Sequence, residues 1–146
     1  MPFVQVVDVT DRLELVDNTK QKISKLAQHM SVFVPKGKVL VTLQGSIGRV
    51  AITQYESYVD RTILIFEDFS EITDKYFWAY TIQQKFDIEK QIAPGGTIKT
   101  ITKEALSSFT ILLPKVEEQK RIGTFFQDLD NLITLHQRKP FLQRRR

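Results

Sequence analysis

The C-terminal third of the chain most strongly limits how this sequence can fold, because its pattern is typical of one long amphipathic helix. Apolar residues recur there at spacings of three and four, which places them on one side of a helix. They are Ile122, Phe125, Phe126, Leu129, Leu132 and Ile133, and the polar residues expected on the outer side are Lys120, Gln127, Asp130, Asn131 and Thr134. The apolar stripe needs a covering surface, either the body of the same chain or another helix.

The chain also marks the two ends of this helix. Pro114 suits its entry, and Glu117 and Glu118 fall in the first turn, where the positive end of the helix dipole favours carboxylates. Pro140 lacks a backbone donor and clashes with the preceding turn, so we expect regular helix to end near Lys139. The sequence therefore divides into a body at residues 1–114, a long helix at residues 115–139 and a basic tail at residues 140–146.

The chain of 146 residues is long enough for one domain with a real core. It contains no cysteine, which excludes disulfides and thiolate metal sites. No stretch has the apolar length of a membrane span, and residues 1–5 lack the layout of a signal peptide. We therefore expect a cytoplasmic protein.

Charge is unevenly distributed along the chain. Residues 1–114 hold thirteen basic and thirteen acidic residues, so the net charge of +4 comes from residues 115–146, with eight basic and four acidic. Within the body, residues 18–55 carry six cations and no Asp or Glu, whereas residues 56–74 carry six acids and one Arg. A face built around residues 18–55 would suit a phosphate backbone, although lysines that merely solvate a surface give the same pattern.

The body is predicted to be α+β, a small globular domain of short strands with a few helices. Patterning predicts strands at residues 3–9, 39–43, 50–52, 62–66 and 109–113, and helices at 23–30, 74–86 and 102–106. A segment at 13–16 is a candidate to pair with the first strand. In the helix at 23–30, Ile23, Leu26, Ala27 and Met30 share one side, and Asp74 is expected to cap the helix at 74–86. The aromatic side of the helix at 74–86 could stack on bases, but a core role is favoured.

A Gly-x-x-Gly turn joins two of the predicted strands. No helix is predicted directly after Gly45 and Gly48, as a nucleotide-binding loop would require. The two glycines therefore indicate only a backbone turn. The turn places Gln44, Ser46 and Arg49 near one rim of the domain. Side chains of these types contact base edges or phosphates in DNA-binding proteins.

The sequence contains none of the common catalytic motifs that we searched for. His29 and His136 are isolated, and the sequence has no nucleophile elbow, phosphate-binding Gly-Lys-Ser/Thr loop or His-Glu-x-x-His helix. We predict neither an enzyme nor a bound metal or cofactor.

The order of the segments resembles a known family, the specificity (S) subunits of type I restriction-modification systems. The strongest element is Leu113-Pro114, then Glu118-Gln119-Lys120-Arg121-Ile122, then Leu129-Asp130. Further matching segments lie at residues 34–41, 45–52, 76–80 and 95–106, so the resemblance covers roughly residues 5 to 139.

The resemblance implies a target recognition domain that reads one half of a split sequence in double-stranded DNA. It also implies that the long helix is a spacer and dimerisation helix, which pairs with another such helix and docks methyltransferase subunits and, through them, the restriction subunit. S subunits have no catalytic activity. A full S subunit carries two recognition domains and two long helices, whereas this chain has one of each and lacks the usual first segment, so we expect a half-subunit or a fragment. Two copies paired through their helices would read an inverted repeat with a fixed gap.

Specific residues follow from this interpretation. Phosphate contacts are predicted from Lys36, Lys38, Arg49, Lys99 and Lys103, and base contacts from Gln44, Ser46 and Thr97. The helix interface is predicted at the apolar stripe. The alternative is a truncated protein-interaction module that binds methyltransferase or S subunits through the helix without productive DNA reading.

Overall fold

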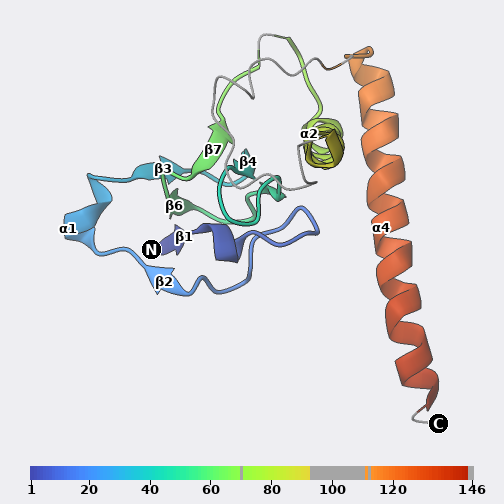
Figure 1. Cartoon of the computed structure of the whole chain (residues 1–146), viewed down its shortest axis with the longest axis horizontal. Coiled ribbons are helices and arrows are strands. Elements are labelled where there is room, and N and C mark those ends of the chain that lie inside the picture. Colours follow the sequence, from blue (N-terminus) through green and yellow to red (C-terminus); the bar gives the residue numbers. More distant parts are fainter. Residues whose placement is uncertain (70, 93–110, 112, 145–146) are drawn as a thin grey trace.

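In the part of the chain that the structure describes, the fold contains two small β-sheets, a helix that covers one of them and a long C-terminal helix (Figure 1). This computed structural model describes residues 1–69, 71–92, 111 and 113–144. The four-stranded sheet has the order β2-β1-β6-β3, with β1 at Pro2–Val4, β2 at Gln21–Lys22, β3 at Val32–Val34 and β6 at Ser57–Val59. The three-stranded sheet has the order β5-β4-β7, with β4 at Val39–Thr42, β5 at Val50–Ile52 and β7 at Ile63–Phe66. The helices are the 3-10 turn η1 at Val6–Asp8, α1 at Lys25–Gln28, α2 at Lys75–Ile92 and α4 at Val116–Arg144.

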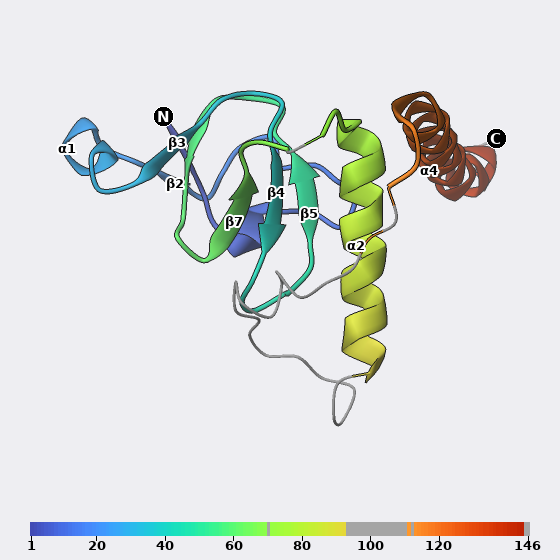
Figure 2. The same ribbon diagram turned by 90° about the horizontal axis from the view of Figure 1, so that it is seen from above.

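Strand β4 lies at the centre of the core, and its four residues are all buried. Successive side chains of a strand point to opposite faces, so Val39 and Val41 belong to one apolar cluster and Leu40 to another. The first cluster lies between the three-stranded sheet and α2, and includes Ala79, Ile82 and Phe86. The second lies between the two sheets, and includes Val4, Val34 and Val59. The layers therefore run from the four-stranded sheet through the three-stranded sheet to α2, with α4 outside α2 (Figure 2).

Several predictions from the sequence are confirmed, including the α+β class. Strands β4 and β5 pair in antiparallel fashion across the Gly-x-x-Gly turn, and β7 pairs with the other edge of β4. Asp74 caps α2, because its Oδ2 accepts a hydrogen bond of 3.0 Å from the backbone N–H of Phe77. The aromatic side of α2 is core, since Phe77 and Phe86 are buried and the ring of Trp78 packs edge-on against two other aromatic rings.

The predicted strand at residues 3–9 is shorter than expected. It ends at Val4, and η1 follows directly. The cause is Asp8, whose buried carboxylate accepts hydrogen bonds from the backbone N–H groups of Gln5 at 2.9 Å and Lys20 at 3.2 Å. A side chain that satisfies nearby backbone donors competes with the strand ladder, so the chain turns here.

The predicted helix at residues 23–30 is also shorter, since α1 covers only Lys25–Gln28. Its apolar residues do not form a buried side, because Leu26 and Met30 are 83% and 80% exposed. A short helix whose side chains find no packing partner gains too little to extend. Helix α2, by contrast, continues to Ile92, beyond the predicted end near Phe86.

Helix α4 continues to Arg144, so the predicted end near Lys139 is wrong. Pro140 cannot donate to the carbonyl four residues earlier, but each later residue still can. One missing hydrogen bond in the last turns therefore does not stop the helix. In the predicted strand at residues 109–113, Ile111 and Leu113 adopt no regular structure, and the rest lies outside the described residues. The helix predicted at 102–106 lies outside them as well.

Candidate nucleic-acid and helix interfaces

The turn between β4 and β5 presents two of the predicted base-contacting residues. Gln44 and Ser46 are exposed there, while Ile47 between the two glycines is buried. Buried Thr42 holds the turn, because its hydroxyl donates to the carbonyl of Ser46 and accepts from the backbone N–H of Arg49. The structure therefore gathers the three rim residues predicted from the sequence on one organised turn.

Two of the predicted phosphate-binding cations also make contacts within the fold. Nη1 of Arg49 donates to the carbonyl of Val9 at 3.3 Å, and Nζ of Lys38 donates to the carbonyl of Glu67 at 2.9 Å. Lys36 lies in the turn before β4 and is exposed. The sequence pattern could not distinguish Lys36 from these two, because the carbonyls involved are distant along the chain.

The predicted DNA-contacting residues fall into two groups. Lys36 and Lys38 precede β4, whereas Gln44, Ser46 and Arg49 follow it. At about 3.3 Å per residue, the strand separates Lys38 from the turn by roughly 17 Å, so the two groups do not share one small patch. Thr97, Lys99 and Lys103 lie outside the described residues.

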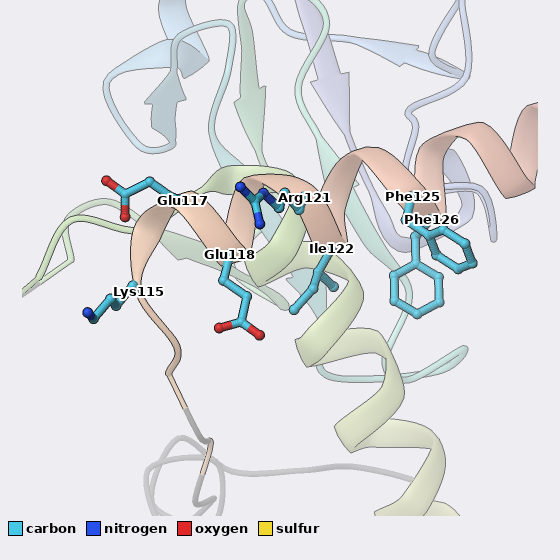
Figure 3. A pocket seen from close by; sticks show the side chains of 7 residues that line it. All are labelled: Lys115, Glu117, Glu118, Arg121, Ile122, Phe125 and Phe126. Carbon is cyan, nitrogen blue, oxygen red and sulfur yellow. The ribbon is translucent and has the colours of Figure 1, made fainter.

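The predicted apolar stripe of α4 is largely exposed. Side chains of Ile122, Phe125 and Phe126 project from one side of the helix and line a hollow near its N-terminal end (Figure 3). Phe125 is 63% exposed and Leu132 is 52% exposed, and Phe126, Leu129 and Ile133 are exposed as well. Only the edge of the stripe meets the body of its own chain, where Phe126 packs on the ring of Tyr80 in α2, and most of the stripe is not buried.

The polar side of α4 faces the body instead. Gln127, Asp130 and Asn131, which we expected on the outer side, line a cleft between α4 and the body together with Tyr76 and Tyr80 of α2. Figure 1 shows α2 end-on and α4 along its length, so the two helices cross. The hydroxyl of Tyr80 donates to Oδ2 of Asp130 at 2.7 Å across this crossing.

This contact changes the ionisation of Tyr80. Burial disfavours the charged phenolate, and the hydrogen bond to the Asp130 carboxylate acts in the same direction, so the pKa of Tyr80 lies well above its ordinary value. A neutral Tyr80 is therefore part of the contact at neutral pH.

Sequence reasoning missed the residues that attach α4 to α2. Gln119 is 1% exposed, and its Oε1 accepts a hydrogen bond of 2.8 Å from the backbone N–H of Asp74. Gly123 lies one turn further along α4, against the start of α2. A glycine inside a helix costs roughly 1 kcal/mol relative to alanine and indicates a close approach, which was the available signal.

Among the described residues, no three His, Asp or Glu side chains gather in a way that could hold a metal ion. Within the same ranges, none of the helices has the length and apolar character that a membrane span requires.

The comparison with known families matches both the body and the long helix. The family described as "Type I restriction modification DNA specificity domain" matches residues 1–141, and this chain belongs to it. The resemblance noted from the sequence motifs is thereby confirmed.

Individual relatives agree with this assignment. A putative type I restriction enzyme specificity subunit of Haemophilus influenzae is 32% identical over 127 residues, covering 83% of this chain and 30% of the relative. The type I restriction enzyme MjaVIII specificity subunit of Methanocaldococcus jannaschii is 26% identical over 119 residues, covering 82% of this chain and 28% of the relative. Specificity subunits are the non-catalytic components of type I restriction-modification systems, so the prediction that this chain is not an enzyme is confirmed.

Solved structures share the fold. The HsdS subunit from Thermoanaerobacter tengcongensis superposes with a TM-score of 0.64 at 17% identity, over 94% of this chain and 31% of that one. A chain from a study of the assembly and conformational transition of the type I R-M system gives a TM-score of 0.68 at 18% identity, over 94% of this chain and 33% of that one. This chain thus spans about a third or less of the length of the relatives it matches.

Proposed function

We propose that this chain reads one half of a split DNA target as the recognition domain of a type I specificity subunit. The observation that carries the proposal is the match of residues 1–141 to a DNA specificity domain. Since the chain spans a third or less of its relatives, the second recognition domain comes either from a second copy or from a longer subunit.

The proposed DNA-contacting residues lie at the two ends of the buried strand β4. Gln44 and Ser46 are exposed at one end and Lys36 at the other, within the segment 18–55 that carries no acidic residue. The strand between Lys38 and the turn spans roughly 17 Å, which corresponds to about five nucleotide steps at 3.4 Å each. A duplex that reaches both ends of β4 would then meet Gln44 with base edges and Lys36 with its phosphates.

Selection of bound DNA from a random pool tests this proposal. Gln44→Ala should lower the preference at one base position by about 1–3 kcal/mol, because glutamine pairs with base edges. Lys36→Ala should weaken binding to all sequences and reduce the slope of log affinity against log salt by about 1. Equal losses on selected and random DNA for Gln44→Ala would remove Gln44 from the set of base-contacting residues.

We propose that α4 is the surface through which this domain binds its protein partners. Its exposed apolar stripe would pair with a second long helix and dock methyltransferase subunits, through which the restriction subunit is reached. Light scattering of the chain alone, and of the chain mixed with a methyltransferase subunit of the same system, measures both associations. A chain that binds the methyltransferase subunit but enriches no DNA sequence would instead be a protein-interaction module that keeps the recognition fold.

A further inference from the structure

The first turns of α2 and α4 are joined by buried polar contacts that the DNA-reading proposal does not use. The side-chain amide of Gln119 connects two places in the chain, because Oε1 accepts from the backbone N–H of Asp74 and Nε2 donates to the carbonyl of Pro114, each at 2.8 Å. Asp74 in turn caps α2 through the N–H of Phe77. One buried side chain therefore ties the entry of α4 to the capped end of α2.

Gly123 brings the two helices into direct contact one turn further on. A Cβ atom at this position would lie 2.8 Å from Oδ2 of Asp74 and 3.1 Å from the backbone nitrogen of Phe77. Real Cβ atoms essentially never come within 3.0 Å of another heavy atom, so a side chain here would displace α2 or α4. At the crossing, the backbone of α4 at Gly123 therefore packs directly against the Asp74 carboxylate that caps α2.

The same face of α4 continues the contact beyond the glycine. The ring of Phe126 packs on Tyr80 with 5.2 Å between centroids, and Asp130 accepts the Tyr80 hydrogen bond. Residues 119, 123, 126 and 130 follow spacings of four, three and four, so they share one face. At about 100° per residue the centre of this face lies roughly a quarter turn from the centre of the apolar stripe, and Phe126 lies at the border between them.

We infer that Gln119 and Gly123 are positioning residues that set the gap between the two halves of the DNA target. This inference rests on the proposed function, in which the spacing of two recognition bodies fixes the gap. Hydrogen bonds at Gln119 and the tight fit at Gly123 specify one register between α2 and α4, whereas apolar and aromatic contacts alone tolerate sliding. A slip of one helical turn, about 5.4 Å, would move the body by roughly one and a half base pairs.

The DNA test uses a pool in which two selected half-sites are separated by gaps of different length. Wild-type protein should enrich one gap, and Gln119→Leu should enrich the same half-sites with two or more gaps. Lys120→Leu is the matched control, because Lys120 is the exposed neighbour on α4, and it should keep the wild-type gap. A folded Gln119→Leu variant with the wild-type gap would overturn the inference.

A second readout does not depend on DNA. Because the chain has no cysteine, spin labels can be placed at Arg61→Cys in the body and Asp128→Cys on α4, both exposed positions. The doubly labelled chain is diluted in unlabelled chain, so that only distances within one chain are measured. Pulsed electron paramagnetic resonance should then give one narrow distance between the two labels, and Gln119→Leu should broaden or shift it. If Gln119→Leu leaves the narrow distance unchanged, the inference is contradicted even if no DNA is bound. If the distance changes but the protein selects no DNA sequence, Gln119 does position α2 on α4 and the proposed DNA-reading function is contradicted.

If the Gln119→Leu variant does not fold, Gly123→Ala replaces it in the label-distance measurement. Alanine favours helix over glycine by roughly 1 kcal/mol, so α4 itself stays helical and a change in the label distance reports on the crossing. A label distance equal to that of the wild type in this variant would also overturn the inference.

Discussion

At the scale of single residues, the two glycines of the β4–β5 turn have different roles. Gly45 and Gly48 both adopt a positive φ, 66° and 82°, which side chains rarely tolerate. Their surroundings differ, because a Cβ at Gly45 would lie 3.7 Å from its nearest neighbour, whereas one at Gly48 would lie 2.7 Å from Cβ of Phe86. Gly48 thus lets the turn pack on α2, while Gly45 serves the turn alone.

Replacing each glycine by alanine separates these roles. Gly45→Ala should lower the free energy of unfolding by about 1–2 kcal/mol, the cost of a left-handed conformation. Gly48→Ala adds an overpacked contact with buried Phe86, so we expect a loss of about 2–4 kcal/mol. Urea unfolding monitored by the fluorescence of Trp78 measures both, and equal losses would contradict the assigned contact with Phe86.

At the scale of secondary-structure elements, the crossing of α2 and α4 depends on polar chemistry more than on the apolar pattern. Tyr80 donates to Asp130 and is partly buried, and both effects favour its neutral form. The pKa of a free tyrosine is about 10, and the folded value lies above it. A raised pKa means that the contact contributes its full stability below the unfolded pKa, and loses it as the pH rises from there through the folded pKa.

The stability of the protein should therefore fall above about pH 10. Tyr80→Phe should reduce this fall, because a phenyl ring keeps the packing on Phe126 but cannot ionise. Tyr55 also has a raised pKa, from burial first and then from Asp8 and Asp17, so part of the fall should persist in the variant. The measurement is the urea midpoint at several alkaline pH values. A Tyr80→Phe variant with the wild-type pH dependence would contradict this assignment.

At the scale of the whole molecule, α4 presents two faces with different surroundings. One face meets α2 through Gln119, Gly123 and Asp130, and the other exposes the apolar stripe. Because the faces lie roughly a quarter turn apart, the helix can hold its own body and a second helix together.

Leu132→Asp tests this division, because Leu132 lies in the exposed stripe, away from the body-facing residues. We expect self-association to weaken by more than about tenfold, since a carboxylate would be buried in the pairing surface, while the unfolding temperature of the body changes little. Sedimentation at several concentrations and thermal unfolding measure the two effects. Thr124→Asp is the control, because it adds the same carboxylate at an exposed position of α4 outside the stripe and the cleft. Unchanged association with a large loss of stability would show that the stripe is packed on its own body.

Local patterns account for the parts of this protein that were predicted correctly. Periodicity identified α2, the apolar stripe of α4 and the central strands, and turn and capping chemistry identified the Gly45–Gly48 turn and the Asp74 cap. These features depend on residues within a few positions of one another, so they can be read from the sequence alone.

Only the tertiary structure decided which surfaces meet. Periodicity shows which residues of α4 share a face but not which face finds the body, and the answer depends on Gln119 reaching Asp74, 45 residues away. Lys38 and Arg49 likewise contact carbonyls 29 and 40 residues distant, which no local pattern records. Such contacts form only when the folded chain brings distant groups together. Where they are partly buried, as at Gln119 and Arg49, they also satisfy backbone groups that would otherwise lose their hydrogen bonds to water.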